Sequence, residues 1–488
     1  MQRITTDIAV IAAGPAGLAA AITAAENDLE VAVFEKMAVP GGTANMGMSP
    51  FGVESRQQKK MMVDLTKEKA FEIMMDYTHW NVDARLVHDY FWKSGETIDW
   101  LEDMGVQFHH VGPYYAGGYA TAHYIQPEGG GEPGPRAASA MIKVMHKHAI
   151  ELGVKFYMET PVKSIRKEGD TVVGLIAAGK DGEEYEVTAK AVIICTGGFG
   201  ANNEMIKQYC GYDWGKDLFS FQIPGVTGDG IRMAWEAGAG KGRMSMERRT
   251  ETPISESNKY FSYMAFEQPR ALTVNQLGER IFNEFEERNS AVFSNVIDQQ
   301  PGRYVYNIMT DRTFKYFRKN GLDLPFSVLP FPFWEMFEEE LPGMLEDYPN
   351  DIFAADSIEE LAEKLGIDPD KLAETVDEYN DACEEGYDDL FLKDRKYLQA
   401  IEGKKFYAVR FFCGAYGSLG GIKVNYKLEV LTDDWKKIPG LYGAGTDVND
   451  IYADTYLYLL AGNTMGFALN SGRLAAEHAA EYIEDMED

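Results

Sequence analysis

The sequence predicts an α/β fold into which a second, α+β domain is inserted. The α/β part begins with a short apolar run at residues 7–11, an Ala-rich helix at 16–26 and a second apolar run at 30–34. This order is typical of a β-α-β unit of about 30 residues with buried strands. The insertion is indicated by frequent aromatic and acidic residues after residue 240, and by the return of a Gly-rich β character from residue 406.

The spacing of the hydrophobic residues and the positions of the glycines predict the remaining helices, strands and loops. Amphipathic helices are expected within 56–104 and at 136–152, with a long Gly-, Tyr- and Pro-rich loop at 112–134. Further strands are expected at 155–158, 162–165, 172–178, 184–189 and 191–195, and further helices at 357–365, 370–384 and 463–486. The predicted division assigns 1–240 and 403–488 to the α/β domain and 241–402 to the inserted capping domain.

Composition and charge exclude some classes of binding partner. The chain has 488 residues and a formal net charge of −30, so its acidic surface repels phosphate backbones and anionic lipid. Neither nucleic acid nor membrane is therefore expected as a partner. No two of the four cysteines are spaced C-x-x-C, so no metal site is expected. Without a long apolar run or room for a signal peptide before the first strand, a cytoplasmic location is expected.

The turn after the first strand carries a dinucleotide-binding fingerprint. It reads Ala12-Ala13-Gly14-Pro15-Ala16-Gly17, a form of G-x-G-x-x-G in which Ala12 replaces the first glycine. Gly14 lets the backbone approach a pyrophosphate, Gly17 lets helix and strand pack closely, and the helix N-terminus presents N–H groups to phosphate. Glu35, at the end of the second strand, can accept both ribose hydroxyls. The alternative interpretation is a tight Ala/Gly packing turn.

Further motifs follow in order along the whole chain. They include Glu35-Lys36…Gly41-Gly42-Thr43, Thr196-Gly197-Gly198-Phe199-Gly200, Thr227-Gly228-Asp229-Gly230, Gly278-Glu279-Arg280…Asn283-Glu284, Gly440-Leu441-Tyr442-Gly443-Ala444-Gly445 and Gly462…Gly466. In this set the chain resembles the fumarate reductase/succinate dehydrogenase flavoprotein superfamily (FAD-binding type 2), which includes the 3-ketosteroid dehydrogenases. The resemblance implies a Rossmann-like FAD-binding domain with an inserted α+β capping domain that meets the substrate.

The resemblance also implies which residues hold the cofactor. FAD would be bound non-covalently, because no histidine lies between residues 1 and 78, where some members of the superfamily tether it. Where the family usually has Glu after its Ala-Gly, this chain has Thr446-Asp447. The implied cofactor contacts are Ala13, Gly14, Ala16, Gly17, Glu35, Lys36, Gly41, Gly42, Thr43, Val162, Thr196, Gly197, Gly198, Asp229, Gly445, Thr446, Asp447, Asn463, Thr464 and Met465.

Two further positions are implied to act in catalysis. In fumarate reductases an arginine delivers a proton four residues after the Asn-Glu motif, and that position is Arg288 here. The alternative is a surface arginine balancing neighbouring glutamates. In ketosteroid dehydrogenases a tyrosine hydroxyl and a glycine N–H four residues on hold the substrate ketone, and Tyr458 and Gly462 have that spacing. The alternative is that Tyr458 packs among neighbouring tyrosines.

The sequence lacks the basic residues that would pair with the two carboxylates of a dicarboxylate substrate. No histidine occurs between His148 and His478, and Leu459 occupies the position of the second arginine, so fumarate and succinate are not expected as substrates. The expected pocket is neutral and aromatic, with Tyr115, Tyr119, Tyr416, Gly417 and Ser418 as its residues.

The predicted function is FAD-dependent hydride transfer between flavin N5 and a neutral cyclic substrate. The expected reaction is reduction, or the reverse dehydrogenation, of a C=C conjugated to a carbonyl, as in a steroid enone. Two alternatives remain open: a reductase of an isoflavonoid or polyphenol such as tetrahydrodaidzein, and a flavoprotein electron-relay subunit of a fumarate-reductase-like complex. The expected partners are an apolar or phenolic small molecule and, as electron donor, NAD(P)H or a redox protein.

Overall fold

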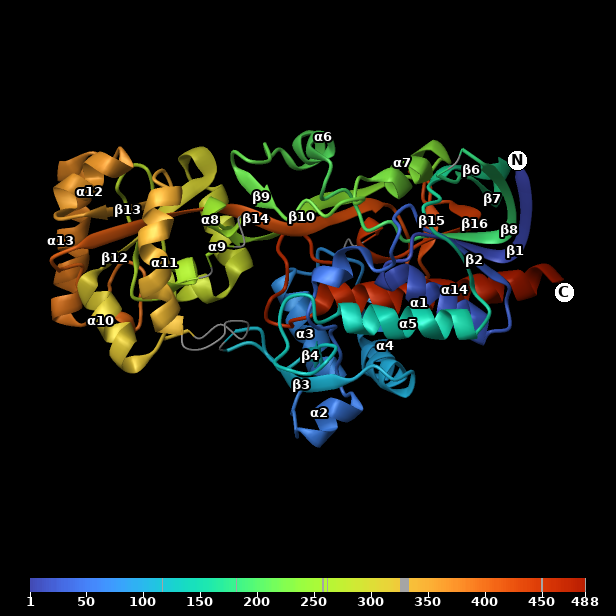
Figure 1. Cartoon of the computed structure of the whole chain (residues 1–488), viewed down its shortest axis with the longest axis horizontal. Helices are drawn as coiled ribbons and strands as arrows, with labels where there is room; N and C mark the ends of the chain where they lie inside the picture. The colour runs from blue at the N-terminus through green and yellow to red at the C-terminus, as the bar shows by residue number, and fades with distance from the viewer. Residues whose placement is uncertain are drawn as a thin grey trace.

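The structure is a computed structural model, and it describes residues 1–115, 117–180, 182–256, 259–260, 262–324, 333–448 and 451–487. Two large sheets lie end to end along the molecule, and both chain termini lie at the same end (Figure 1). The long strands β10 (Lys241–Glu251) and β14 (Phe406–Ile422) lie in the second sheet and extend toward the first.

The first sheet carries the Rossmann-like unit that the sequence predicts. Its strand order is β15-β16-β8-β1-β2-β5, with β7 paired to β8 and β6 to β7. β1, β2, β5, β8 and β16 run parallel, and Ile11 at the end of β1 pairs with both Phe34 and Ile194. The carboxyl ends of three strands therefore meet at one edge, where α/β folds bind ligands. The bounds are β1 Gln2–Ile11, β2 Val31–Phe34, β5 Lys155–Tyr157, β6 Val162–Glu168, β7 Thr171–Ala178, β8 Glu184–Ile194, β15 Glu429–Leu431 and β16 Lys437–Gly443.

Three helices cover one face of this sheet. Helices α1 (Pro15–Glu26), α5 (Ser139–Glu151) and α14 (Asn463–Glu487) lie side by side beneath it (Figure 1). The side chains of α1 at these contacts are small and apolar, since six of its twelve residues are alanines and nine of the twelve are buried. Two of these helices, α1 and α14, begin near the sheet edge where the strands end, so their N-termini face the same region.

The second sheet forms the capping region. Its order is β10-β14-β12-β11, with β13 and β9 paired to β14. Because β9 and β14 lie outside residues 241–402, this sheet draws strands from all three predicted segments, and the three-part division stays a prediction. The bounds are β9 Leu218–Ser220, β11 Leu272–Val274, β12 Tyr304–Thr310, β13 Ile352–Ala355, α8 Pro253–Glu256, α9 Ser290–Asp298, α10 Asp311–Asn320, α11 Phe333–Asp347, α12 Ile358–Leu365 and α13 Pro369–Glu385.

A smaller helical group projects below the junction of the two sheets (Figure 1). It contains α2 (Arg56–Lys60), α3 (Lys67–Tyr77) and α4 (Ala84–Asp103), whose N-caps Ser55, Thr66 and Asp83 each accept a backbone N–H. The prediction of a long loop at 112–134 is in part wrong, because β4 (Ala122–Ile125) is a buried strand that pairs with β3 (Phe108–Gly112). The two strands expected within 184–195 are the single strand β8. The remaining short elements are η1 Gly42–Met46, α6 Asn203–Met205, η2 Ile206–Cys210, α7 Asp229–Glu236, η3 Ser262–Phe266, η4 Glu284–Arg288, η5 Pro301–Arg303, η6 Arg395–Tyr397 and η7 Gly445–Asp447.

Among the helices that the structure describes, none combines the length and the apolar composition that a bilayer crossing requires.

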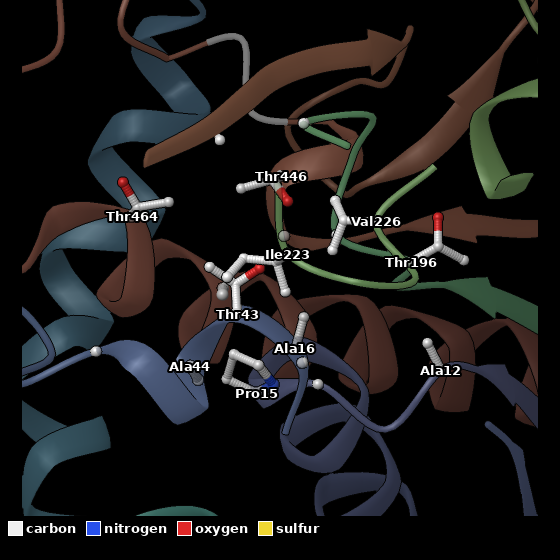
Figure 2. Close-up of a pocket in the computed structure, with 18 of the residues that line it drawn as sticks. Ala12, Pro15, Ala16, Thr43, Ala44, Thr196, Ile223, Val226, Thr446 and Thr464 are labelled. Carbon is white, nitrogen blue, oxygen red and sulfur yellow. The ribbon is translucent and has the colours of Figure 1, made fainter. Parts of the chain in front are cut away.

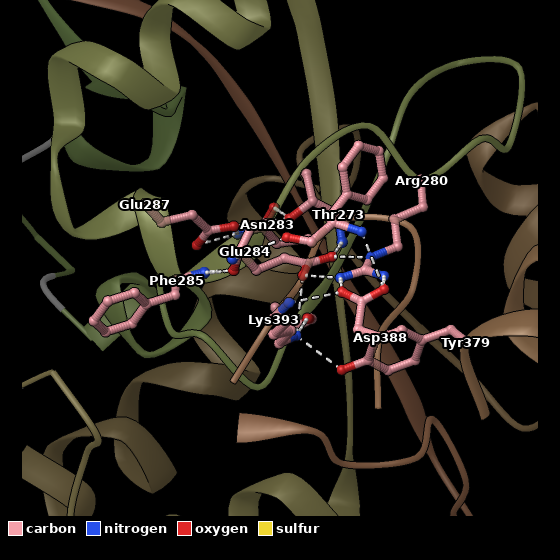
Figure 3. A network of polar contacts seen from close by, with 12 residues as sticks. Thr273, Arg280, Asn283, Glu284, Phe285, Glu287, Tyr379, Asp388 and Lys393 are labelled. Carbon is pink, nitrogen blue, oxygen red and sulfur yellow. Dashed lines mark hydrogen bonds and ion pairs between the residues drawn. The ribbon is translucent and has the colours of Figure 1, made fainter. Parts of the chain in front are cut away.

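A buried charge network fixes the turn η4 inside the capping region (Figure 3). Arg280 Nη2 lies 2.9 Å from Glu284 Oε2 and 2.8 Å from Asp388 Oδ2, and Lys393 Nζ lies 3.0 Å from Glu284 Oε2. Lys393 also donates to Tyr379 Oη at 2.8 Å and to the carbonyl of Ala271 at 2.9 Å. The side chains of Lys393 and Glu284 are both 0% exposed. Two cations balance two carboxylates, so each buried charge has partners that offset its desolvation.

We expect Lys393→Met to lower the free energy of unfolding by about 3–5 kcal/mol, because it leaves the buried Glu284 with one cation in place of two. Urea denaturation followed by circular dichroism measures the change. The matched control is Lys371→Met, which removes a half-exposed lysine paired with Glu374 on α13 and should change stability by less than about 0.5 kcal/mol. Equal effects of the two substitutions would contradict the role given to the buried network.

Candidate functional site

A cavity of about 300 Å³ lies where the first sheet meets the long strands of the second. Its walls come from segments far apart in the sequence: the ends of β1, β2 and β8, the strands β10 and β14, and the start of α14. In Figure 2, Ala12 and Thr196 lie on one side of the view and Thr464 on the other. The cavity therefore spans from the N-terminal turn to the N-terminus of the last helix.

The predicted fingerprint turn forms one end of this cavity. Ala12 has φ of +81°, a left-handed conformation that favours glycine, in agreement with the first glycine of the fingerprint. A Cβ on Gly17 would lie 1.9 Å from the carbonyl oxygen of Ala12, so only glycine permits this close packing. At Gly14 an added Cβ would meet nothing within 4 Å, and the side of the turn that faces the cavity is open. No side chain caps the N-terminus of α1, so its first N–H groups are available to an anion.

Glu35 is held in place by backbone donors. The N–H of Ala13 donates to one carboxylate oxygen at 2.8 Å and the N–H of Met37 to the other at 2.7 Å. Glu35 lines the cavity although it is 6% exposed. Each oxygen keeps acceptor capacity toward the cavity, as a ribose-binding carboxylate requires.

Lys36 and Asp229 form a polar group on the same side. Lys36 donates to Thr227 Oγ1 at 3.0 Å and is paired with Asp229, and Asp229 also pairs with Arg232 at 2.7 Å. Burial raises the pKa of Asp229, but the two cations outweigh this effect and lower it below its usual range. Asp229 is therefore an ionised acceptor at the cavity wall.

Asp447 acts on the turn after β8 and not on the cavity. The backbone N–H groups of Thr196 and Gly198 donate to its carboxylate, the latter at 2.8 Å, and Thr196 Oγ1 donates at 3.0 Å. Asp447 is fully buried, and this burial raises its pKa to about 6. The sequence predicts a cofactor contact for Asp447, whereas the structure places it behind Thr196, because the backbone donors of that turn take its carboxylate.

The predicted cofactor residues fall into two groups, those that line the cavity and those that lie behind it. Fourteen residues of the predicted set line the cavity: Gly14, Ala16, Glu35, Lys36, Gly42, Thr43, Val162, Thr196, Gly197, Asp229, Gly445, Thr446, Thr464 and Met465. Six lie behind it and support its walls: Ala13, Gly17, Gly41, Gly198, Asp447 and Asn463. Asn463, for example, accepts from Tyr452 Oη at 2.7 Å, and its carbonyl accepts from Tyr90 Oη at 3.0 Å. These bonds anchor the first turn of α14.

Four tyrosines line the cavity on the side of the capping sheet: Tyr114, Tyr416, Tyr456 and Tyr458. The hydroxyls of Tyr114 and Tyr416 lie 3.0 Å apart, and the ring of Tyr458 is 5.5 Å from Tyr114 and 4.8 Å from Tyr456. Tyr458 is 3% exposed, and its hydroxyl has no hydrogen-bond partner among the described residues. Burial raises the pKa of Tyr458 well above its usual value, so the hydroxyl stays protonated and can donate.

The backbone beside Tyr458 offers a second donor. Gly462 lines the cavity with φ of +82°, and its carbonyl accepts from Phe51 N at 2.8 Å and Gly466 N at 2.9 Å. Within the described part of the chain its own N–H has no hydrogen-bond acceptor. The 25-residue helix α14 begins at the next residue, so a positive helix end faces the same space.

Three predicted substrate-site residues lie outside the cavity lining. Tyr119 is 37% exposed, and its backbone N–H donates to the carbonyl of Leu459 at 2.9 Å. Tyr115 is buried, but Tyr114, its neighbour, is the loop tyrosine that lines the cavity. Arg288 lies over the ring of Phe285, with Nη2 3.5 Å from Glu286 Oε2, and borders Gly117. The cavity lining does include the other predicted residues, Tyr416, Gly417, Ser418, Tyr458 and Gly462.

The sequence interpretation missed two charged residues of β10. Glu247 lines the cavity and is buried, which raises its pKa to about 7. Arg249 lies behind Tyr416, with its guanidinium 5.0 Å from the ring centroid and 3.4 Å from Glu251. Neither residue belongs to a motif or a charge pattern, since residues 247–249 read Glu-Arg-Arg within a strand of mixed polarity. Only the tertiary fold brings them to the site.

The residues present fit an FAD. One end of the cavity holds an anion-binding helix end and a fixed carboxylate. It also holds Gly14 and Gly42, where an added Cβ would meet no atom within 4 Å. A second helix N-terminus and a wall of aromatic side chains occupy the other, as an isoalloxazine with its negative pyrimidine side requires.

Comparisons with known proteins agree with this fit. A family model described as "FAD binding domain" (FAD_binding_2) matches residues 7–465. Curated relatives include the vinyl phenol reductase of Lactiplantibacillus plantarum, 29% identical over 98% of this chain and 97% of that protein. The urocanate reductase of Eggerthella lenta is 30% identical over 91% of this chain and 70% of that protein. The fumarate reductase (cytochrome) of Shewanella frigidimarina is 29% identical over 98% of this chain and 77% of that protein.

Solved structures show the same fold. The 3-ketosteroid-Δ4-(5α)-dehydrogenase of Rhodococcus jostii superposes with a TM-score of 0.77 at 23% identity, covering 98% of both chains. A flavocytochrome c3 fumarate reductase superposes with a TM-score of 0.70 at 24% identity, covering 98% of this chain and 79% of that one. The predicted superfamily and fold class are thereby confirmed. The chain belongs to the FAD binding domain family (FAD_binding_2), and it is an FAD-dependent oxidoreductase.

Proposed function

We propose that this FAD-dependent oxidoreductase, which acts on carbon–carbon double bonds, reduces a neutral cyclic substrate whose C=C is conjugated to an oxygen-bearing group. The observation that carries the proposal is a pair of unpaired donors. Tyr458 and Gly462, four residues apart, line the same cavity, and neither the Tyr458 hydroxyl nor the Gly462 N–H has a partner among the described residues. Two buried donors that converge on one oxygen stabilise the negative charge that develops there.

The cofactor is proposed to bind non-covalently along the cavity. Gly14 and the N-terminus of α1 would hold the pyrophosphate, Glu35 the ribose, and Thr464 with the N-terminus of α14 the flavin end. Reduced FAD supplies the hydride when bound. The electron donor is proposed to be NAD(P)H or a redox protein. Since the sequence has one dinucleotide fingerprint, which we assign to FAD, NAD(P)H would have to bind without a second Rossmann unit.

The chain's own groups would orient the substrate and exclude water. The ring walls of Tyr114, Tyr416 and Tyr456 favour a flat apolar or aromatic molecule, since aromatic rings pack well at centroid separations of about 4.5–7 Å. Tyr458 and Gly462 would donate to the oxygen at one end of the conjugated system. A steroid enone and a phenolic alkene are both flat molecules with an oxygen at one end. Hydride addition places negative charge directly on the enone oxygen; a phenolic alkene reaches the same point once its hydroxyl proton is lost and a proton has added to the alkene carbon, which gives a quinone methide. A relative that aligns over nearly its whole length is named for a phenol.

Arg288 enters the proposal as the proton donor on the basis of the resemblance alone. Its guanidinium lies against Phe285 and Gly117, outside the cavity lining. Because the buried charge network holds η4 in the capping region, the role requires the capping region to move toward the cavity as a unit when substrate binds, a closure that many enzymes make.

We expect Gly14→Ala to weaken FAD binding at least tenfold while the apoprotein unfolds as the parent does. The added methyl group meets no protein atom but occupies the space proposed for pyrophosphate. Gly17→Ala is the contrasting variant, since its methyl group collides with the carbonyl of Ala12 and should destabilise the fold by about 1–3 kcal/mol. FAD titration by fluorescence quenching and urea denaturation measure the two effects. Unchanged FAD affinity in Gly14→Ala would place the pyrophosphate elsewhere.

We expect acid precipitation of the purified flavoprotein to release all of its flavin into the supernatant as intact FAD. Non-covalent contacts are lost when the protein unfolds, whereas a covalent link is not. Chromatography of the supernatant and absorbance of the washed pellet check this. A yellow pellet would contradict non-covalent binding.

We expect Tyr458→Phe to lower kcat/KM for the best alkene substrate by about 10²–10³-fold, because one of two oxyanion donors is lost. Arg288→Ala should lower kcat without changing the affinity for FAD. The control is Tyr387→Phe, which alters an exposed tyrosine (60% exposed) of the capping region. Stopped-flow reoxidation of the reduced enzyme measures the rates. Parental rates in both Tyr458→Phe and Arg288→Ala would refute this mechanism.

A further inference from the structure

Glu247 is a buried carboxyl group at the cavity wall whose bonding is incomplete. It lies on β10, is 6% exposed and lines the cavity. Thr464 Oγ1 donates to its Oε1 at 2.6 Å. Among the described residues, Oε2 has no hydrogen-bond partner and no cation pairs with the carboxyl.

The neighbouring arginines do not supply the missing partner. Arg248 pairs with Asp298 at 2.9 Å and donates to Tyr212 Oη at 3.0 Å. Arg249 pairs with Glu251 and donates to the carbonyl of Thr250 at 2.9 Å. Each arginine beside Glu247 along the chain thus already has its own acceptors.

A buried carboxyl group that lacks partners is costly, and such groups concentrate where a ligand completes them. The structure itself contrasts the two cases: Glu284, which is fully buried, has Arg280, Lys393 and the N–H of Thr273 around it. Among the described residues, Glu247 has only Thr464. The cavity is where a ligand can complete the bonding of Glu247, and the ionised form of its carboxyl group takes a donor there.

The surroundings of Glu247 indicate which molecule brings that donor. The groups that interact electrostatically with it are Tyr416, Tyr452, Tyr456 and Tyr458, and all of these except Tyr452 line the cavity. The groups proposed to hold the adenosine end, Lys36 and Asp229, are paired with each other. Glu247 thus lies between Thr464, at the proposed flavin end, and the aromatic wall, and a donor that comes from the substrate side would meet it among these rings.

We infer that Glu247 is a substrate-recognition residue that accepts a hydrogen bond from a hydroxyl group of the substrate, so that the preferred substrate class is a phenolic alkene. This inference rests on the proposed function and deepens it. A carboxylate can accept from a phenol but repels another carboxylate, and an enone without a hydroxyl group leaves it unsatisfied. The ring of the phenol would lie among the tyrosines.

The test is a binding measurement on the oxidised flavoprotein with two non-reducible probes. 4-Ethylphenol carries the donor, and 4-ethylanisole replaces its hydrogen with a methyl group. Perturbation of the flavin absorbance spectrum reports binding without turnover. We expect the parent to bind the phenol at least tenfold more tightly than the anisole, and Glu247→Gln, which removes the charge but keeps the shape, to reduce this ratio to threefold or less.

Matched variants separate recognition from structure. Glu236→Gln makes the same chemical change at an exposed position of α7 and should keep the parental ratio. Glu247→Asp keeps the charge but withdraws it by one methylene, and should give an intermediate ratio. It also serves as the second variant if Glu247→Gln does not fold.

The outcomes distinguish this inference from the proposed function. A parental phenol-to-anisole ratio in Glu247→Gln overturns the inference. Weaker FAD binding in Glu247→Gln without any probe also overturns it, since the carboxyl would then bind the cofactor. A parent enzyme that discriminates the probes but reduces neither 4-vinylphenol nor steroid enones supports the recognition role and refutes the proposed reaction. Reduction of 4-vinylphenol and 4-vinylanisole with equal kcat/KM refutes only the recognition role.

Discussion

The site depends on the close packing of α1 against the end of β1 and of α14 against α1. A Cβ on Gly17 would lie 1.9 Å from the carbonyl of Ala12, and a Cβ on Gly472 would lie 2.2 Å from the carbonyl of Ala16. These two glycines let α1 approach β1 and let α14 approach α1. Because both helices are held this closely, both N-termini point into one cavity. Either helix end alone would be an ordinary anion site, whereas two of them at one cavity suit the two ends of a dinucleotide.

The second constraint is the free-energy cost of burying charged and polar groups. In the capping region, Arg280, Glu284, Asp388 and Lys393 satisfy one another, and their role is to hold the backbone of η4. At the cavity, Tyr458, Gly462 and Glu247 retain unused donor or acceptor capacity among the described residues. Incomplete bonding of a buried group costs free energy, and at the cavity a ligand can offset that cost. Buried atoms without a partner also occur away from the cavity, as at Glu267 Oε1, so incomplete bonding indicates a ligand site only where the group also lines the cavity.

The sequence predicts which residues lie at the cavity most directly where their position is set by neighbours in the chain. Gly14, Glu35, Thr196 and Gly462 each belong to a local turn whose geometry the motif encodes, and all line the cavity, while their roles stay predictions. Positions set by a distant partner are not readable from the sequence in this way. Asp447 faces the turn at Thr196, more than two hundred residues away, and Tyr119 bonds the backbone of Leu459 instead of entering the pocket. Glu247 carries no local pattern at all, because its partner Thr464 lies on another element.

The cavity also explains why identity to relatives does not carry their substrates to this chain. Lys36 is the only lysine or arginine among the described residues that line it, and Asp229 already neutralises that charge. Arg249 lies behind Tyr416 and is paired with Glu251, so its charge is shielded from the cavity. A dicarboxylate would bring two negative charges to a wall that holds Glu247 and no free cation, and the interaction would be repulsive at low dielectric. Alignment of nearly the whole chain with 77% of a fumarate reductase therefore does not by itself carry that protein's substrate to this chain.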